Sequence, residues 1–434
     1  MIEKKKRTFY LESYGCQMNV YDSQIAATLL ENQNFQEVSI PEEADFILLN
    51  TCAIRENAHE KIYHRLNELS QNKKKEQKIA ILGCMAQNLK EELWQRTPVD
   101  YLFGPDALRH LSHLEVQGPK TAYLELSRTE TYDEIYPHKK TTGVHAYVTI
   151  QRGCNNFCSF CVVPYTRGRE RSRPVSSIVR EIQLLVAQGV SMVTLLGQNV
   201  NSYRYEGYDF ADLVETILEK TEIKRIYFTS PHPKDFPEKL LYLMAREERF
   251  GNYIHLPLQS GSDKILKKMK RNYTQKRFLE LVAKIREIVP GVVLSTDVIV
   301  GFSGESEEDF AQTLHAMEKA DFDFAYMFAY SERKGTIAGR LYPDDISSEE
   351  KKRRLNILIE EQNKRSWRKN QEYVGSQVDV IVEKKARRGE NHLLGRMRNF
   401  KKVVFPASDD IQFGQRLQVK IHRATSMTLL GELV

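Results

Sequence analysis

Residues 145–161 read HAYVTIQRGCNNFCSFC and join a strand-like run to three closely spaced cysteines. The run 145–151 is rich in apolar, β-branched and aromatic residues, which is typical of a strand. Cys154, Cys158 and Cys161 follow it in a Cys-x3-Cys-x2-Cys pattern. Three thiolates on one short loop can bind three irons of a cubane cluster and leave the fourth iron open to a small molecule. The spacing therefore predicts an iron–sulfur cluster with an open iron, just past a strand end.

Other metal sites fit this loop less well. A structural zinc site needs four closed ligands, and no fourth cysteine or histidine is adjacent. Ferredoxins use Cys-x2-Cys-x2-Cys with a fourth cysteine further along the chain. Zinc, or a cluster used only to pass electrons, remains the alternative.

An alternation of strands and helices continues after the cysteine loop. We expect strands at 145–151, 192–196, 225–229, 253–256, 292–298 and 324–328, with helices between them at 177–188, 209–220, 237–247, 275–288 and 307–320. Six such units predict a partial (β/α)6 barrel, whose active site would face the carboxyl ends of its strands. A long charged helix over 347–370 is expected to close this part of the chain.

The first part of the chain has the same alternation on a smaller scale. Strands are expected at 7–13, 44–50 and 78–82, and helices at 22–32, 56–72 and 88–96. This α/β pattern favours a parallel sheet with right-handed crossovers. The polar stretch 118–142 predicts a linker between this sheet and the barrel.

Three further cysteines each follow one of the N-terminal strands. Cys16, Cys52 and Cys84 are far apart in the sequence. The carboxyl ends of parallel strands share one edge of a sheet, where ligands collect, so we predict that these thiols meet in space. The alternative is three unrelated buried cysteines, which behave as small apolar residues.

The last part of the chain changes to short strands and positive charge. Strands expected at 378–382, 393–397, 402–405, 417–421 and 429–434 predict a small all-β barrel. Residues 373–434 hold 11 Lys and Arg against 6 Asp and Glu, while the whole chain has a net charge of +6. This concentration of charge favours nucleic acid as a partner, although a solvated surface would have the same composition. The residues suited to an RNA backbone and an unstacked base are Lys384, Lys385, Arg387, Arg388, Arg396, Arg398, Phe400, Lys401, Lys402 and Phe405.

The overall composition is that of a globular protein, with 41% apolar and 28% charged residues. No apolar run is long enough to span a bilayer, which predicts no membrane partner. The N-terminus is basic but no apolar core follows it, so we expect no secretory signal and a cytoplasmic location. That compartment keeps thiols reduced, which favours metal ligation over disulfides for the six cysteines.

The cysteine loop, with Phe160 before its last cysteine, resembles the signature of radical S-adenosylmethionine enzymes. In that superfamily the amino and carboxylate groups of S-adenosylmethionine chelate the open iron. An electron from the cluster then cleaves a carbon–sulfur bond and gives a 5′-deoxyadenosyl radical. The position of the loop, after the first strand of a partial barrel, fits this resemblance.

The resemblance extends over nearly the whole chain. The stretches 14–19, 50–55 and 83–87 are similar to the N-terminal domain of methylthiotransferases, in which Cys16, Cys52 and Cys84 would hold a second four-iron cluster. Residues 395–399 and 431–433 resemble parts of the TRAM domain, an RNA-binding barrel. The domains implied are 6–122 for the N-terminal domain with the auxiliary cluster, 140–371 for the radical S-adenosylmethionine domain, and 373–434 for TRAM.

The substrate is indicated by the residues around the loop of Cys154, Cys158 and Cys161. This loop follows the dispersed cysteines in the chain and is called the second cysteine loop below. Residues 161–170 and 172–174 are similar to the methylthiotransferase branch acting on tRNA, and 17–19 and 55–58 point the same way. That branch adds a methylthio group to carbon 2 of N6-isopentenyladenosine (dimethylallyladenosine), next to the anticodon. The alternatives are the sister branches, which act on N6-threonylcarbamoyladenosine in tRNA or on an aspartate of ribosomal protein S12. An RNA-binding protein with a structural metal and no catalysis is the alternative of another class.

The resemblance also implies cofactors and partners. One S-adenosylmethionine would methylate a sulfur carried on the auxiliary cluster, and a second would supply the radical that couples the methylthio group to carbon 2. The cofactors and partners are therefore two [4Fe-4S] clusters, S-adenosylmethionine, the anticodon stem-loop of tRNA, a sulfur donor, and a reducing electron donor such as flavodoxin or ferredoxin. The residues expected to contact the cofactor are Phe160, Arg167, Gln198, Asn199, Ser295 and Asp297. An ordinary β–α turn at 198–199, a structural loop near 295–297 and an ion-paired surface at Arg167 remain the alternatives.

Overall fold

The computed structural model describes residues 6–53, 56–137, 143–387, 389, 391–408 and 410–434 of the chain. The chain forms two compact units. The first unit contains residues up to 140 together with 151–157 and 161–177, and the second contains 141–150, 158–160 and 178–434. Several features expected from the sequence lie outside the described residues: the basic start of the chain at 1–5, residues 54–55 of one motif, the linker segment 138–142, and Arg388.

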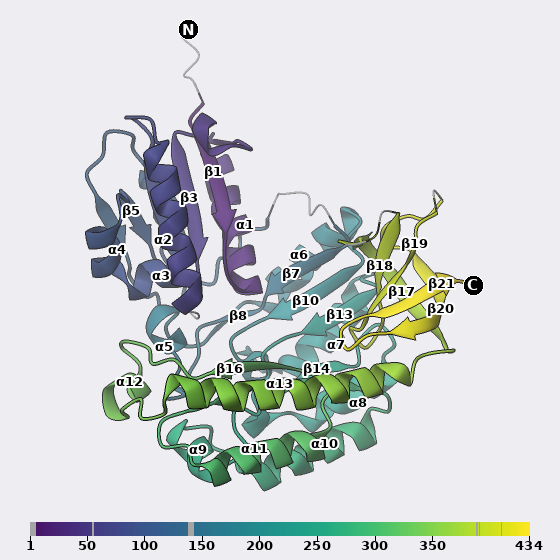
Figure 1. The fold of residues 1–434 in the computed structure, drawn as a ribbon. Helices are drawn as coiled ribbons and strands as arrows, with labels where there is room; N and C mark the ends of the chain where they lie inside the picture. Colours follow the sequence, from purple (N-terminus) through teal and green to yellow (C-terminus); the bar gives the residue numbers. More distant parts are fainter. Residues whose placement is uncertain (1–5, 54–55, 138–142, 388, 390, 409) are drawn as a thin grey trace. The chain divides into compact units, whose positions relative to one another are not determined.

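The first unit is built on the parallel sheet that the sequence predicts. Its strand order is β2-β1-β3-β4-β5-β6, and each pair of neighbouring strands is parallel (Figure 1). The strands are β1 (Thr8–Ser13), β2 (Gln36–Glu37), β3 (Phe46–Thr51), β4 (Lys78–Gly83), β5 (Tyr101–Phe103) and β6 (Thr121–Tyr123). The helices are α1 (Gln17–Glu31), α2 (Glu56–Gln71), α3 (Cys84–Asn88), α4 (Lys90–Arg96) and α5 (Val163–Thr166). The segments 151–152 and 171–172 pair as β8 and β9.

The central strands form because their side chains are apolar on both faces. Every residue of β3 is buried, and one of its faces, with Ile47 and Leu49, belongs to a core that includes Leu66 of α2. The expected strands and helices are confirmed, but three strands of this sheet were missed. β2, β5 and β6 are only two or three residues long, too short for a periodic pattern. β6 lies inside the segment expected to be a linker, so that expectation is wrong for residues 121–123.

The second unit contains the expected partial barrel. Its six parallel strands lie in two sheets, β13-β10-β7 and β14-β15-β16, and a parallel bridge joins Ile226 to Phe250 between them. The strands are β7 (His145–Thr149), β10 (Met192–Leu196), β13 (Arg225–Phe228), β14 (Tyr253–His255), β15 (Val293–Val300) and β16 (Phe324–Ala329). The helices are α6 (Val175–Ala187), α7 (Phe210–Lys220), α8 (Glu238–Arg246), α9 (Asp263–Lys268), α10 (Gln275–Ile288), α11 (Glu307–Ala320), α12 (Ile337–Leu341) and α13 (Ser348–Gln371). A short hairpin, β11 (Arg204–Tyr205) and β12 (Tyr208–Asp209), precedes α7.

The C-terminal part of the second unit is a closed five-stranded barrel, as the sequence predicts. Its strand order is β17-β18-β19-β21-β20, shown in green and yellow in Figure 1. The strands are β17 (Gln377–Lys385), β18 (His392–Arg396), β19 (Lys402–Pro406), β20 (Arg416–Ala424) and β21 (Leu429–Leu433). Its interior is filled by a cluster that includes Val380, Phe405 and Ile421.

The turn between β18 and β19 packs on the amino-terminal ends of the large barrel's strands. Phe400 stacks on Tyr253, the first residue of β14, and also contacts Tyr227 and His145. The Tyr227 hydroxyl donates a hydrogen bond to the carbonyl oxygen of Met397 at 2.7 Å. The active-site edge of a β/α barrel is the opposite, carboxyl-terminal one, so this contact does not involve that edge. Among the described residues, no helix is long and apolar enough to cross a membrane.

Candidate metal centres and cofactor site

In the first unit, Cys16, Cys52 and Cys84 follow the ends of β1, β3 and β4 at one edge of the sheet. The strand register aligns these ends, because Ser13 pairs with Asn50 in β3. The Cys16 and Cys52 thiols share a hydrogen bond. Cys52 and Cys84 are buried and Cys16 is partly exposed. The structure therefore brings this triad together, as the sequence predicts.

Glycines make the close approach of these cysteines possible. Gly15 has φ of +120°, and a Cβ atom on it would lie 2.4 Å from the Cβ of Cys52. Gly83 has φ of +92°, and a Cβ there would lie 2.4 Å from Oδ1 of Asn50. Any larger residue at Gly15 would push Cys52 away, so the Gly-Cys pair is part of the site.

A buried arginine joins the triad from the second cysteine loop. Arg167 Nε donates to Cys84 Sγ at 3.2 Å, and its Nη2 donates to Asp22 at 2.7 Å and to Asn19 at 3.2 Å. Asn19 Oδ1 also lies 3.4 Å from the sulfur of Cys16. The Nη1 atom of Arg167 is buried without a hydrogen-bond partner. The guanidinium therefore keeps one unused donor nitrogen, next to a nitrogen that already donates to the sulfur of Cys84.

The charges around the triad favour thiolate. The hydrogen bond from Cys52 lowers the pKa of Cys16 to about 6, and Arg167 acts in the same direction against the effect of burial. Burial raises the pKa of Cys84, although Arg167 opposes the shift. Thiolates are the form that binds iron, so at least one ligand is available near neutral pH without a metal.

Asp22 and Asp106 organise the buried cations of the first unit. Asp22 accepts from Arg152 at 2.8 Å as well as from Arg167. Asp106 accepts from Arg171 at 2.8 Å. Three buried guanidinium groups thus face two carboxylates, and the excess positive charge suits an anionic group held by the cysteines. The alternative of an ion-paired surface at Arg167 is wrong in one respect, because these pairs are buried rather than on the surface.

The sequence did not single out Asp22, Asp106 or Arg152. Burial of a charged residue depends on which segments pack together, and no local pattern reports it. Among the described residues, no three His, Cys, Asp or Glu side chains are arranged around a single metal ion. A cluster distributes its ligands over different irons, so its cysteines are more widely spaced than the ligands of one ion.

The second cysteine loop is held by backbone hydrogen bonds in each unit. In the first unit, Cys154 N donates to Gly168 O at 3.1 Å. In the second unit, Ser159 N donates to Met269 O at 3.0 Å, and Ser159 O accepts from Ala338 N at 2.7 Å. Phe160 packs in an apolar cluster with Met269, so its expected contact with the cofactor stays a prediction.

Buried polar atoms without partners gather after the carboxyl ends of the large barrel's strands. Gln198 and Asn199 follow β10, and each has an unpaired side-chain oxygen. The others are Ser159 Oγ, His232 Nε2, Ser303 Oγ, Glu305 Oε1 and Tyr330 Oη. Buried polar groups normally have partners, so this edge suits a polar cofactor such as S-adenosylmethionine. This observation favours the expected roles of Gln198 and Asn199.

Ser295 and Asp297 are already engaged within the second unit. Ser295 Oγ lies 2.7 Å from Tyr253 Oη and 2.8 Å from His255 Nδ1. Asp297 Oδ2 lies 3.3 Å from His255 Nε2. Their expected contact with the cofactor stays a prediction. His255 contacts both side chains, and as a lone histidine it carries no spacing signal in the sequence.

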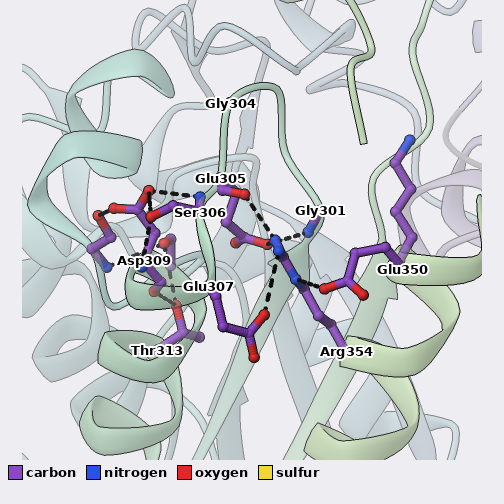
Figure 2. A network of polar contacts seen from close by, with 12 residues as sticks. Gly301, Gly304, Glu305, Ser306, Glu307, Asp309, Thr313, Glu350 and Arg354 are labelled. Carbon is purple, nitrogen blue, oxygen red and sulfur yellow. Dashed lines mark hydrogen bonds and ion pairs between the residues drawn. The ribbon is translucent and has the colours of Figure 1, made fainter. Parts of the chain in front are cut away.

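A polar network fixes the loop that follows β15 (Figure 2). Arg354 of α13 donates to the carbonyl oxygen and to Oε2 of Glu305, at 2.9 and 2.7 Å. The same Oε2 accepts from the backbone N of Gly301 at 2.6 Å. Arg354 and Lys351 are buried, so the long charged helix α13 does not expose all of its cations to solvent.

The expected RNA-binding residues divide into two groups. Arg398 donates to the carbonyl oxygens of Phe250 and Met244, and Lys401 pairs with Asp323 at 3.0 Å. Arg396 is paired with Glu383, and Phe405 is fully buried. Arg396 and Phe405 are buried, so the expected exposure of these two residues to RNA is wrong. Arg398, Phe400 and Lys401 make contacts within the second unit but stay partly exposed, so their binding to RNA stays a prediction. The residues that remain exposed are Lys384, Lys385, Arg387 and Lys402.

Three families match successive parts of the chain. Residues 8–104 match the family described as Uncharacterized protein family UPF0004, 148–317 match the Radical SAM superfamily, and 371–434 match the TRAM domain. Among solved structures, the fold is similar to the radical S-adenosylmethionine methyltransferase TsrM from Kitasatospora setae, with a TM-score of 0.57 and 14% identity over 77% of each chain. It is also similar to the cobalamin-dependent S-adenosylmethionine radical enzyme OxsB, with a TM-score of 0.54 and 14% identity over 82% of this chain and 56% of that one.

Relatives with much higher identity cover nearly the whole chain. A protein of Porphyromonas gingivalis named tRNA-2-methylthio-N(6)-dimethylallyladenosine synthase is 45% identical over 99% of this chain and 96% of its own length. A protein of Prosthecochloris aestuarii with the same name is 44% identical over 97% of both chains. With this identity over its full length, the chain belongs to the family of tRNA-2-methylthio-N(6)-dimethylallyladenosine synthases.

Proposed function

We propose that this protein transfers a methylthio group to carbon 2 of N6-dimethylallyladenosine, next to the anticodon in tRNA. The observation that carries the proposal is the meeting of Cys16, Cys52 and Cys84 at one sheet edge, in a chain that also has a separate Cys-x3-Cys-x2-Cys loop. Two cysteine triads in one chain suit a reaction that needs both a radical source and a sulfur carrier. The names of the full-length relatives support this substrate over the sister branches.

Each triad would hold one [4Fe-4S] cluster. Cys154, Cys158 and Cys161 would bind the cluster that S-adenosylmethionine approaches, and the dispersed triad would bind the auxiliary cluster. A reduced cluster with an open iron supplies, when bound, the electron that cleaves S-adenosylmethionine to a radical. A radical is required because the hydrogen on the aromatic carbon 2 is a poor leaving group in polar chemistry.

The chain's own residues position these groups. The unpaired oxygens of Gln198 and Asn199 would accept hydrogen bonds from the bound S-adenosylmethionine. Arg167 would neutralise the charge of the auxiliary site and hold Cys84 through its Nε–H. The remaining cofactor residues that we propose are Phe160, Ser295 and Asp297.

The remaining parts of the proposal concern domains and partners. The boundaries 6–122, 140–371 and 373–434 are proposed for the three domains, with the last binding the anticodon stem-loop. A sulfur donor and a reducing protein such as flavodoxin or ferredoxin would complete the reaction. We place the reaction in the cytoplasm, where thiols stay reduced.

Iron content tests the two-cluster arrangement. Anaerobically purified protein is expected to hold about eight irons, and about four in each triple Cys→Ala variant, at 154/158/161 or at 16/52/84. The two triple variants serve as matched controls for each other, because each removes three thiols from one triad only. If the wild type holds four irons and the 154/158/161 variant loses all of them, the proposed auxiliary cluster does not exist. The sulfur-transfer step would then be excluded as well.

The substrate is tested by nucleoside analysis of tRNA from a strain lacking the gene. Loss of 2-methylthio-N6-dimethylallyladenosine, with its unthiolated precursor accumulating, supports the proposal. Intact methylthiolated dimethylallyladenosine, together with unmodified ribosomal protein S12 or missing methylthio-threonylcarbamoyladenosine, would assign the protein to a sister branch. A protein without iron that still binds tRNA would favour the non-catalytic alternative.

A further inference from the structure

Arg271 is a buried cation that donates a hydrogen bond to one cysteine of the second loop. Its Nη1 donates to Cys158 Sγ at 3.1 Å, and its Nε donates to Tyr273 Oη at 3.0 Å. Nη2 lies 3.5 Å from the carbonyl oxygen of Pro257. All of these residues belong to the second unit. The sulfur of Cys158 is therefore the only contact of this guanidinium, among those the described residues show, that would serve as a ligand of an anionic cluster.

No carboxylate is paired with Arg271 in the part of the chain that the structure describes. Burial opposes the charge of Arg271, while the Tyr273 hydroxyl and the Cys158 sulfur beside it raise its pKa above the ordinary value. A buried cation without a counter-charge costs several kcal/mol, so it persists only where another group repays that cost. An anion next to Cys158 would do so.

The backbone holds Arg271 in place with strained geometry. Lys270 and Asn272, on either side, have φ of 56° and 58°, which is unusual for residues other than glycine. Arg271 N donates to the carbonyl oxygen of Leu266 at 3.0 Å and so closes the end of α9. Tyr273 Oη is itself fixed by the carbonyl oxygens of Pro257 and Leu258. Such strain is retained where the resulting side-chain position matters.

We propose that Arg271 is a positioning residue that tunes the cluster on the second cysteine loop through its hydrogen bond to Cys158. This inference rests on the proposed function, since it presupposes a cluster at Cys158. Reduction adds one electron to the cluster and hence one negative charge, and a guanidinium donating to a ligand sulfur stabilises that added charge. Arg271 thereby raises the reduction potential and makes the cluster easier to reduce.

The test measures the midpoint potential of this cluster alone. In a Cys16/Cys52/Cys84→Ala background, a potentiometric titration followed by electron paramagnetic resonance reports only the cluster of the second loop. Arg271→Gln keeps a hydrogen-bond donor but removes the charge. We expect the ratio of reduced to oxidised cluster at a fixed potential to fall at least tenfold, which is a shift of about 59 mV to more negative potential. Arg271→Lys, which restores the charge, is expected to lie between Gln and wild type.

Arg277→Gln is the matched control, because it removes the same charge from an exposed position on α10. It is expected to leave the potential unchanged. A wild-type potential in Arg271→Gln with full iron content would overturn the inference. If Arg271→Gln loses iron, the midpoint potential of the Arg271→Lys variant decides between tuning and a structural role. A shifted potential in the Lys variant supports tuning, whereas a wild-type potential, or no iron in a folded protein, assigns Arg271 a purely structural role.

The proposed function fails in a different way. If the background protein itself binds no iron, the second loop holds no cluster and the proposed function falls. If it binds iron and cleaves S-adenosylmethionine, the radical-generating part of the proposed function stands whatever the Arg271 variants show.

Discussion

Phe400 in the turn after β18 stacks on Tyr253 at the start of β14, with ring centroids 4.8 Å apart and planes inclined by 7°. The ring also meets Tyr227 edge-on, with centroids 4.7 Å apart. Arg396 lies over the Phe400 ring, with its guanidinium carbon 4.1 Å from the ring centroid. The small β-barrel is thus joined to the large barrel by an aromatic contact, in a segment whose composition alone suggests nucleic-acid binding.

Replacing Phe400 by Ala should destabilise the second unit. The substitution removes the aromatic contacts with Tyr253 and Tyr227 and leaves a cavity, so we expect the free energy of unfolding to fall by about 2–3 kcal/mol. Urea unfolding followed by circular dichroism measures this. Phe413→Ala is the control, because Phe413 is 48% exposed in the same small barrel. Equal losses in the two variants would contradict the docking role of Phe400.

Replacing Lys384, Lys385 and Arg387 together by Ala should weaken tRNA binding without affecting stability. These side chains are exposed at the end of β17 and beyond it. Each phosphate contact that is lost reduces the slope of log affinity against log salt concentration by about 0.7–0.9. Binding of tRNA measured at several salt concentrations should therefore show lower affinity and a shallower slope.

The control for that variant removes three cations from α10, where Lys276, Arg277 and Lys284 are exposed. It should keep the wild-type salt slope. Unchanged tRNA affinity in the β17 variant would place the RNA-binding surface elsewhere in the chain.

Stability should depend on pH through His145. Burial, helped by Arg396 and Lys384 and opposed by Glu383, lowers the pKa of His145 to about 4 in the folded protein. The unfolded chain binds the proton at about pH 6.5, so between about pH 6.5 and 4 it holds more protons than the folded state. The free energy of unfolding should therefore fall as the pH is lowered through this window, by at most about 1.4 kcal/mol per pH unit from this residue.

The measurement compares urea unfolding of wild type and His145→Gln at several pH values. The Gln variant should show a smaller loss of stability between pH 6.5 and 4. Some loss should remain, since burial also lowers the pKa of His232. Identical pH dependence in both proteins would mean that His145 titrates normally.

Replacing Arg167 by Gln should release iron from the auxiliary site. The variant loses the hydrogen bond to Cys84 and the positive charge beside Cys16, so the cysteines hold an anionic cluster less well. In a Cys154/Cys158/Cys161→Ala background, iron per chain should fall from about four towards zero after gel filtration. Arg169→Gln is the control, because Arg169 is exposed two residues away. If the Arg167→Gln variant keeps its full iron content, the role of Arg167 is limited to its ion pair with Asp22.

Much of the fold follows from local patterns. Apolar strands and periodic helices bury the faces that their sequence patterns predict. Examples are the strands at 46–51 and 192–196 and the helices at 210–220 and 275–288. The Cys-x3-Cys-x2-Cys loop is visible for the same reason, because its ligands are close in the chain. Short strands such as β5 and β6 were missed, since three residues carry no period.

The α/β architecture, the small β-barrel and the Cys-x3-Cys-x2-Cys loop can be predicted from the sequence, because they depend on periodicity and on spacing along the chain. Which charged residues are buried depends on the tertiary structure. Arg167 lies against Cys84, Arg271 against Cys158, and Lys401 against Asp323, each across a long sequence separation. A lysine or arginine looks the same in the sequence whether it faces water or an anion. Its role is set by the charges that folding brings beside it, and by the cost of burying it without them.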